Sequence, residues 1–340
     1  MNMPQQDGID FVIAWVDGGD PEWQRDMARY LPEARGETDV RPERYRNWDL
    51  LRYWFRGVER FAPWVRRIHF LTWGHLPPWL DTSHPKLHVT KHGEFLPQSA
   101  VPTFNCNAFE ANLHRIPGLS ERFVYFNDDM MLLREVRPED FFRGDKPRDM
   151  LVLQPVVANP ANPVMSHLLL NESLTLCKYF DKRRSMRTHP GQYFHPGYPP
   201  LCFFYNLLET LFPLYTGFYT VHGPSPMLRS TFAELWEKEA ELLNEVTCRR
   251  FRDSRDVNQY LFRSWEKLKG NFVPANLHRD FSYFNIQDTE KACRFIRQRR
   301  KKMVCVNDTS EEIDFPAVKR ELTAAFQAIL PQPSAFEADR

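Results

Sequence analysis

Short apolar runs that end in polar turn residues recur along the chain and predict the strands of a sheet. The first run, residues 9–16, is almost wholly apolar, which suits a strand covered on both faces. The turn residues at 17–21 then interrupt it. Four later runs share this form and predict further strands at 67–73, 86–90, 122–126 and 303–306.

Apolar residues at helical spacing fill several of the stretches between these runs. The clearest predicted helix spans 47–61, where Asn47 is a plausible N-cap. Further helices are expected at 105–116, 229–245, 253–269 and 315–329. Alternating strands and helices predict an α/β fold with a mostly parallel, Rossmann-like sheet flanked by helices.

The middle of the chain differs in composition from its flanks. Residues 159–214 are rich in Pro, His and aromatic residues and predict a partly irregular helical lobe, either an insertion or an acceptor-side segment. We expect a single domain over 1–330, with its α/β core in 8–158 and 215–330. Residues 331–340 are expected to form a loose tail.

Charge and composition exclude several classes of protein. The net charge of the 340 residues is only +1, which argues against a dedicated nucleic-acid binder. No apolar run approaches the roughly 18 residues needed to span a bilayer, and residues 1–7 lack the features of a signal peptide. The six cysteines are scattered without a Cys-x-x-Cys pair, which fits a reducing compartment, so we expect a cytoplasmic protein.

Three of the predicted strands end in acidic or amide side chains. Asp17 follows the first strand, Asn127-Asp128-Asp129 follow the run at 122–126, and Asn307-Asp308 follow the last. A single ending of this kind is equally consistent with a turn. In one parallel sheet, however, all three would gather at the edge where such sheets bind ligands. A divalent cation that bridges a nucleotide diphosphate would relieve the repulsion between these acids, and no P-loop or dinucleotide fingerprint is present.

The residues around these strand ends carry a resemblance to a known family. The chain resembles the Stealth family of bacterial sugar-1-phosphate transferases, and it is similar to the metazoan GlcNAc-1-phosphotransferase. The match rests on four blocks in the family's order: Ile9–Gly18, Asn47–Asp129 with gaps, His222–Asn258 with gaps, and Cys305–Asp308.

The resemblance implies a nucleotide-sugar-transferase-like fold and a specific reaction. A sugar-1-phosphate would pass from a nucleotide-diphosphate sugar such as UDP-GlcNAc to a hydroxyl of a growing capsular or exopolysaccharide, with release of UMP. His222 would act as the base and Arg252 would clamp phosphate oxygens. Asp128 would take part in catalysis and, with Asp129 and Asp308, would hold Mg²⁺ or Mn²⁺.

Seven further residues match family positions and complete the predicted site. Glu110 would be catalytic and would orient a sugar hydroxyl or His222. The predicted substrate-binding residues are Asp17, Gly18, Arg115, Asn127, Asp256 and Asn307. Taken singly, each of these residues is more often structural than functional.

Two other interpretations of the same residues remain open. A metal-dependent glycosyltransferase would use the same acidic strand ends but would release a nucleoside diphosphate. A non-catalytic carbohydrate-binding protein would use the aromatic residues for stacking. The basic run at 294–302 could dock an anionic polymer or a membrane surface, although such a run is more often a solvated helix face. A peripheral association with the inner face of the plasma membrane or with capsule assembly is a further expectation.

Overall fold

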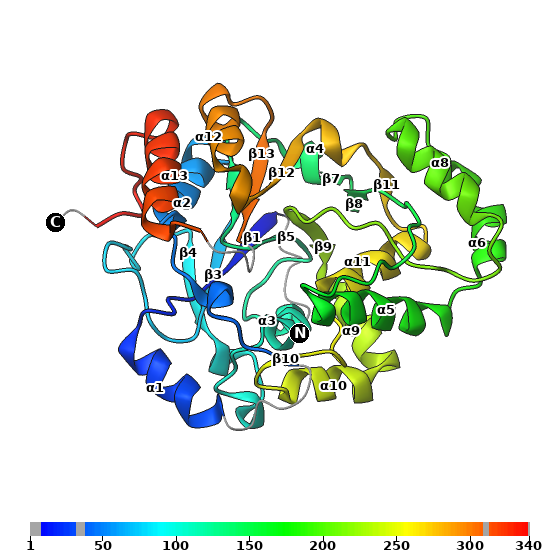
Figure 1. Cartoon of the computed structure of the whole chain (residues 1–340), viewed down its shortest axis with the longest axis horizontal. Coiled ribbons are helices and arrows are strands. Elements are labelled where there is room, and N and C mark those ends of the chain that lie inside the picture. Colours follow the sequence, from blue (N-terminus) through cyan, green and yellow to red (C-terminus); the bar gives the residue numbers. More distant parts are fainter. Residues whose placement is uncertain (1–7, 32–37, 309–312, 339–340) are drawn as a thin grey trace.

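A five-stranded sheet forms the centre of the computed structural model, which describes residues 8–31, 38–308 and 313–338 (Figure 1). Residues 1–7, where we expected no signal peptide, lie outside the described part. The strand order is β4-β3-β1-β5-β9, and the first four strands are parallel while β9 is antiparallel. These strands are β1 (Ile9–Trp15), β3 (Ile68–Thr72), β4 (Leu87–Lys91), β5 (Arg122–Phe126) and β9 (Ser225–Leu228). The predicted mixed α/β fold with parallel strands is confirmed.

The last predicted strand lies in a different sheet, which corrects the expectation of one sheet edge. Here β13 (Met303–Asn307) pairs in parallel with β12 (Phe281–Asn285) and antiparallel with β6 (Met130–Leu132). After β5 the chain turns within three residues into β6, and β13 pairs with β6 instead of joining the main sheet. The two sheets still meet, because the backbone N–H of Val306 donates to the carbonyl of Asp129 at 3.0 Å.

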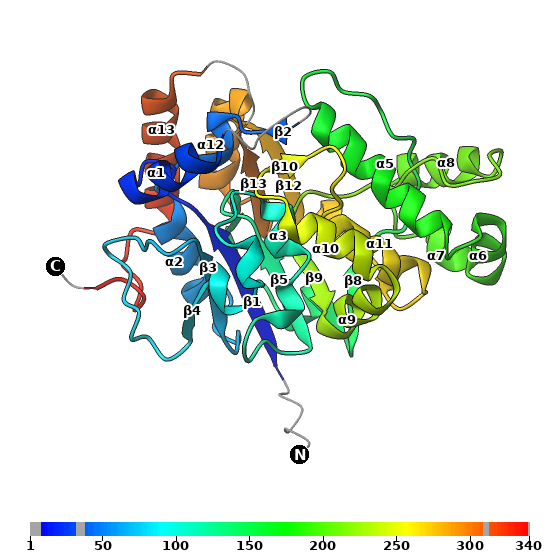
Figure 2. The same cartoon turned by 90° about the horizontal axis from the view of Figure 1, so that it is seen from below.

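Helices cover both faces of the main sheet (Figures 1 and 2). Side chains of β1 alternate between two apolar layers, as the strand period requires: Phe11 and Ile13 belong to one layer and Val12 to the other. The first layer includes α2 (Leu51–Phe61), α12 (Thr289–Gln298) and α13 (Phe315–Ile329). The second includes α9 (Arg229–Lys238), α10 (Ala240–Cys248) and α11 (Gln259–Leu268).

The predicted lobe at 159–214 is helical and extends to one side of the sheet (Figure 2). It contains α5 (Pro163–Cys177), α6 (Lys182–Thr188), α7 (Pro190–Tyr193) and α8 (Pro200–Glu209). The remaining elements are short: α1 (Pro21–Tyr30), β2 (Thr38–Asp39), α3 (Cys106–Glu110), α4 (Pro138–Phe141), β7 (Phe142–Arg143), β8 (Lys146–Asp149), β10 (Arg252–Asp253) and β11 (Val273–Pro274).

Two helix boundaries differ from the predictions for local reasons. The helix predicted from Asn47 begins only at Leu51, because the Asn47 side chain accepts a hydrogen bond from the N–H of Asp49 (2.9 Å), which has a positive φ of 55°. The helix predicted at 253–269 begins at Gln259, since the preceding residues include β10, which pairs with β2.

The expectation of a loose tail from 331 is wrong for residues 331–338. Phe336 is buried in the layer that contains α2, and Glu337 forms an ion pair with Arg56 at 2.7 Å. The apolar side chain and the charge pair together dock this segment on the core. Residues 339–340 lie outside the described part of the chain.

Candidate active site

A cavity of about 540 Å³ lies where the carboxyl ends of β1, β5 and β13 meet. Val16 lines it from the end of β1, and three consecutive residues line it from the end of β5, namely Asn127, Asp128 and Asp129. Asn307 and Asp308 contribute from the end of β13. The polar ends of two strands in separate sheets therefore converge on one cavity.

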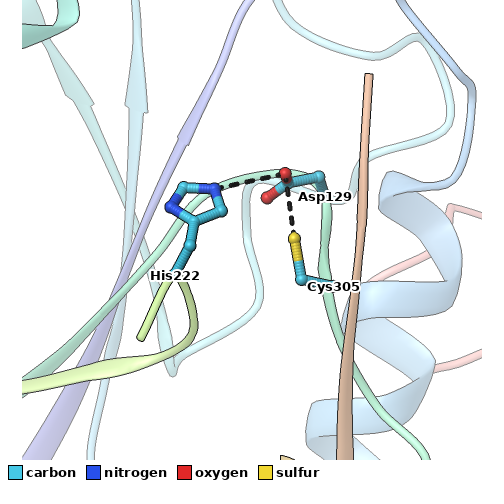
Figure 3. A group of neighbouring side chains, drawn as sticks. All are labelled: Asp129, His222 and Cys305. Carbon is cyan, nitrogen blue, oxygen red and sulfur yellow. Dashed lines mark hydrogen bonds and ion pairs between the residues drawn. The ribbon is translucent and has the colours of Figure 1, made fainter. Parts of the chain in front are cut away.

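His222 and Asp129, which both line this cavity, lie next to one another (Figure 3). The Nδ1 atom of His222 lies 2.7 Å from the Tyr260 hydroxyl, so the ring is anchored from behind. Its Nε2 atom points the other way and lies 3.5 Å from the Oδ2 atom of Asp129. Asn307 completes the group, since its Nδ2 atom lies 3.1 Å from the same carboxylate oxygen and 3.4 Å from Nε2.

The two adjacent carboxylates have opposite electrostatic surroundings. Burial, followed by the negative charge of Asp129, raises the pKa of Asp128 to about 7. Burial also opposes ionisation of Asp129, but hydrogen bonds with His222, Cys305 and Asn307 lower the pKa of Asp129 below its usual value. The pair thus holds one full negative charge and a second group that ionises near neutral pH.

The donor set fits a hard divalent cation bound through oxygen. The Oδ1 atom of Asp129 is buried and has no hydrogen-bond partner among the described residues. Asp128 supplies a second carboxylate beside it, as Mg²⁺ or Mn²⁺ would require. Possible ligand atoms of Asp129, His222 and Cys305 also lie within 4.8 Å of one another, but burial raises the pKa of the Cys305 thiol, which donates to Asp129 at 3.1 Å. The protonated thiol therefore supports the carboxylate from behind and is a poor ligand for such an ion.

Arg252 presents an unpartnered cation to the same cavity. Its backbone is fixed by the pairing of β10 with β2, and its Nε atom is buried without a hydrogen-bond partner among the described residues. Burial disfavours the charge, but nearby acidic groups, including Asp39 and Glu110, raise the pKa of the guanidinium above its usual value. A buried guanidinium without a carboxylate partner is a natural site for phosphate oxygens.

Two more arginines line the cavity and were missed in the sequence. Arg44 donates to Asp39 (2.9 Å), and Arg46 lies 3.5 Å from Asp308. That ion pair uses the carboxylate predicted to hold metal, although Asp308 still lines the cavity. The cluster of three arginines between 41 and 46 was the available signal, but its short 3₁₀ turn has no periodic pattern.

Glu110 lies in the wall of the cavity with both carboxylate oxygens engaged. It accepts hydrogen bonds from the Tyr125 hydroxyl and from the backbone N–H of Gln259, each at 3.2 Å. The second contact places the carboxylate at the amino-terminal end of α11, where the helix dipole favours a negative charge. Burial raises the pKa of Glu110. The geometry thus ties Glu110 to α11, and the structure shows no hydrogen bond between Glu110 and His222.

Two of the predicted substrate-binding residues at the end of β1 do not line the cavity. The side chain of Asp17 accepts from the N–H of Gly19 at 2.9 Å, which closes the turn. A Cβ at Gly18 would lie 2.4 Å from the carbonyl of Tyr45, so glycine is needed for this close approach. Asp17 and Gly18 thus form the turn against which the segment at 41–46 packs.

Arg115 and Asp256 also lie away from the cavity. Arg115 is in a 3₁₀ turn beyond α3, not in the predicted helix, and its guanidinium lies 4.1 Å from the centre of the Trp236 ring. Asp256 is fully buried among four donors, which are the side chains of Asn105, Asn107 and Arg249 and the N–H of Asp253. The predicted contacts of these two residues with substrate are therefore not supported by their positions.

Comparison with known proteins places this site in a family. Models of three Stealth conserved regions match the chain: region 1 at residues 7–34, region 2 at 44–150 and region 4 at 294–340. The capsular polysaccharide phosphotransferase WcwK of Streptococcus pneumoniae is 36% identical over 334 residues, which cover 97% of this chain and 98% of that protein. This chain belongs to the Stealth family.

Other relatives of this Stealth protein have similar names. The receptor polysaccharide phosphotransferase WefC of Streptococcus oralis is 36% identical over 97% of this chain and 99% of its own length. The exopolysaccharide phosphotransferase cps2G of Lactiplantibacillus plantarum is 34% identical over 97% of this chain and 96% of its own length. The Stealth protein described here is accordingly a transferase.

His222 and Arg252 lie between the matched regions of the Stealth models, in the stretch from 151 to 293. The full-length relatives do extend across this stretch, since their alignments cover 97% of the chain. The structure brings both residues to the cavity formed by the matched regions. The Stealth core and the intervening segment thus contribute to one site.

Proposed function

We propose that this enzyme transfers a hexose- or N-acetylhexosamine-1-phosphate from a nucleotide-diphosphate sugar, such as UDP-GlcNAc, to a hydroxyl of a growing capsular or exopolysaccharide. The products are a phosphodiester and UMP. The observation that carries the proposal is the guanidinium of Arg252, whose Nε atom has no hydrogen-bond partner among the described residues, in the same cavity as Asp128 and Asp129. A cation on one side and carboxylates on the other suit a diphosphate bound with a divalent metal.

The donor would bind across the carboxyl ends of the parallel strands. Strands β3 and β4 are added on one side of β1, and β5 then returns to its other side. Ligands of such parallel sheets bind at this switch point between β1 and β5. We therefore propose a Rossmann-like nucleotide site there, with Arg44, Arg46 and Arg252 near the phosphates. Asn127 and Asn307, which line the cavity, are available to bind substrate hydroxyls.

The transfer itself requires one bond to form and one to break at phosphorus. The acceptor oxygen attacks the phosphorus that carries the sugar, and the bond from that phosphorus to the UMP oxygen breaks, so UMP leaves with the electron pair. The acceptor proton passes to Nε2 of His222. Tyr260 can accept a hydrogen bond from Nδ1–H at 2.7 Å, which leaves the lone pair on Nε2, and the Asp129 carboxylate would stabilise the imidazolium that then forms.

A metal ion would supply charge neutralisation at the phosphates. Asp128 and Asp129 would hold Mg²⁺ or Mn²⁺, and the ion would stabilise negative charge that develops on the phosphoryl oxygens. Asp308 is placed to hold Arg46 beside the same phosphates. Because nucleotide sugars are found in the cytoplasm, we propose that the enzyme works there, with no role in nucleic-acid binding.

The nucleotide product tests this proposal. The purified enzyme is incubated with UDP-GlcNAc, Mg²⁺ or Mn²⁺ and a polysaccharide acceptor, and nucleotides are separated by chromatography. We expect UMP to accumulate in step with acceptor modification, and to be absent with His222→Ala. Release of UDP would instead identify a glycosyltransferase. A panel of donor sugars is needed before inactivity is interpreted, and glycan binding without turnover across that panel would favour the carbohydrate-binding alternative.

A further inference from the structure

Helix α8 in the lateral lobe has its apolar and polar faces inverted. Its polar residues Asn206 and Glu209 are buried, with 0% and 2% of their surface exposed. Its apolar side chains face outward, and four of them recur at helical spacing through α8 and the turn that follows. We call these four the apolar face: Leu201, Phe204, Leu208 and Leu211, which are 62%, 58%, 58% and 77% exposed.

The buried polar residues show that this orientation is fixed. Asn206 accepts from the N–H of Leu153 at 2.7 Å, and its Nδ2 atom donates to the carbonyls of Leu151 and Tyr193 at 2.9 and 2.6 Å. Glu209 forms a buried ion pair with Lys182 of α6 at 2.5 Å. Turning the helix to hide the leucines would break both groups of contacts, so the apolar face is held toward the outside.

Exposed basic side chains lie in the same lobe as the apolar face. Helix α6, which is joined to α8 by the Lys182–Glu209 pair, carries three exposed arginines: Arg183, Arg184 and Arg187. The acids of the lobe do not offset them. Glu172 and Glu209 are buried, and the carboxylate of Asp181 caps α6 through the N–H of Arg184 at 2.6 Å. The exposed surface of the lobe therefore carries both apolar and cationic side chains.

We propose that α8 and α6 dock this enzyme on the surface of an anionic phospholipid bilayer. The apolar face would enter the boundary of the acyl chains while the arginines contact lipid phosphates. Among the described residues no helix is long and apolar enough to cross a membrane, and α8 has only 10 residues, so the mode is insertion in the interface. A second copy of the chain is a poorer occupant, because a two-fold contact would bring the arginine groups of both copies together.

Helix α5 extends from the cavity into the lobe. Val164, Met165 and Leu168 of α5 line the cavity, while Leu174 of the same helix is 58% exposed. Docking would thus place the lobe between the membrane surface and the site. This docking surface is distinct from the basic run at 294–302, which lies in and after α12, outside the lobe.

Vesicle co-flotation of the full-length protein tests this inference. Vesicles of phosphatidylcholine alone are compared with vesicles that also contain phosphatidylglycerol. We expect wild type to bind the anionic vesicles, and the triple variant Leu201→Ser, Phe204→Ser, Leu211→Ser to bind at least a hundredfold more weakly. The variant Arg183→Gln, Arg184→Gln, Arg187→Gln should lose roughly fivefold per arginine on anionic vesicles only, an effect that added salt reproduces.

Matched controls separate docking from folding and from catalysis. Leu31→Ser and Leu76→Ser alter exposed leucines elsewhere and should leave flotation unchanged. All variants should retain the wild-type melting temperature and the wild-type rate on a soluble acceptor, so a failure of docking is distinct from a failure of the proposed reaction. Absence of binding to anionic vesicles would overturn the inference. A wild-type dimer that the serine variant converts to monomer, without vesicle binding by either, would also overturn it.

Discussion

Two acids of the fold, Asp256 and Asp129, differ in how completely hydrogen bonds satisfy their carboxylate oxygens. Asp256 is surrounded by four donors that account for both of its carboxylate oxygens. Asp129 has one oxygen engaged and one buried without a partner among the described residues. A fully satisfied buried charge is a structural feature, whereas an unsatisfied one costs free energy unless a ligand completes it.

The same contrast applies to the arginines. Arg115 rests on the Trp236 ring at the surface, whereas Arg252 is half-buried and its Nε atom has no hydrogen-bond partner among the described residues. Both match family positions, and the resemblance implies a catalytic role for Arg252 and a substrate-binding role for Arg115. Their surroundings separate a residue that packs from a residue that is available to a phosphate.

The largest expected effect is on turnover by Arg252→Gln. Loss of a guanidinium that stabilises phosphoryl oxygens should lower kcat/KM by on the order of a thousandfold. The melting temperature should fall only slightly, because no hydrogen bond to a described residue is lost at the buried Nε, although the attraction of acids such as Asp39 and Glu110 is lost. Steady-state kinetics and calorimetry measure the two effects. An Arg252→Gln variant that unfolds early but turns over normally would reverse our assignment.

Asp256→Ala should have the opposite profile. The substitution removes the carboxylate that accepts from two amide side chains and from Arg249. We therefore expect a loss of roughly 3 kcal/mol in the free energy of unfolding. Denaturant titration measures this loss. Asp145→Ala, at a carboxylate whose side chain is 98% exposed, serves as the control and should change stability little. Wild-type stability of Asp256→Ala would show that the buried group is not structural.

Asp128 should make stability depend on pH and on divalent cations. Its pKa rises from 3.8 in the unfolded chain to about 7 on folding, so folding takes up a proton between these values. Its contribution to stability is therefore full below pH 4 and is lost as pH rises to 7. Asp128→Asn should be more stable than wild type at pH 8, by roughly 2 kcal/mol, and this gap should narrow by pH 5.

Divalent cations should reverse that cost at high pH. Mg²⁺ or Mn²⁺ should raise the melting temperature of wild type at pH 8 and have a smaller effect on Asp128→Asn, with Asp145→Asn as the matched control. Equal cation responses in the three proteins would remove Asp128 from the metal site.

The smallest effect is expected for Arg115→Ala. Since its guanidinium packs on Trp236 outside the cavity, kcat/KM should stay within about threefold of wild type. The melting temperature should fall slightly through the lost ring contact, worth about 0.5–1 kcal/mol. A large kinetic loss with a normal melting temperature would return Arg115 to the substrate-binding residues.

Much of this arrangement could be predicted from the sequence where local pattern dominates. The apolar runs gave the parallel strands, the helix at 315–329 has the predicted bounds, and the acidic endings after β5 and β13 do meet. The sheet to which β13 belongs could not be predicted, because strand pairing depends on the tight turn at 127–129. Asp17 was predicted to bind substrate but does not line the cavity, because its side chain closes its own turn.

Residue type alone also could not show which charged side chains have hydrogen-bond partners for all of their polar atoms. Asp256 and Asp129 are both acids within family blocks, and only the donors around each distinguish them. Likewise, the segment at 41–46 has no periodic pattern, so its arginines are visible as cavity residues only once Gly18 and Tyr45 bring the turn against β1.

The fate of the phosphate next to the sugar tests the central claim most directly. A donor that carries radioactive phosphorus at that position is incubated with wild type and acceptor, and the label is followed into the polymer and the nucleotide. The account predicts that the label enters the polymer in equal amount to the sugar and that the released UMP is unlabelled. Label retained in a released nucleoside diphosphate, with unlabelled sugar-modified polymer, would contradict it.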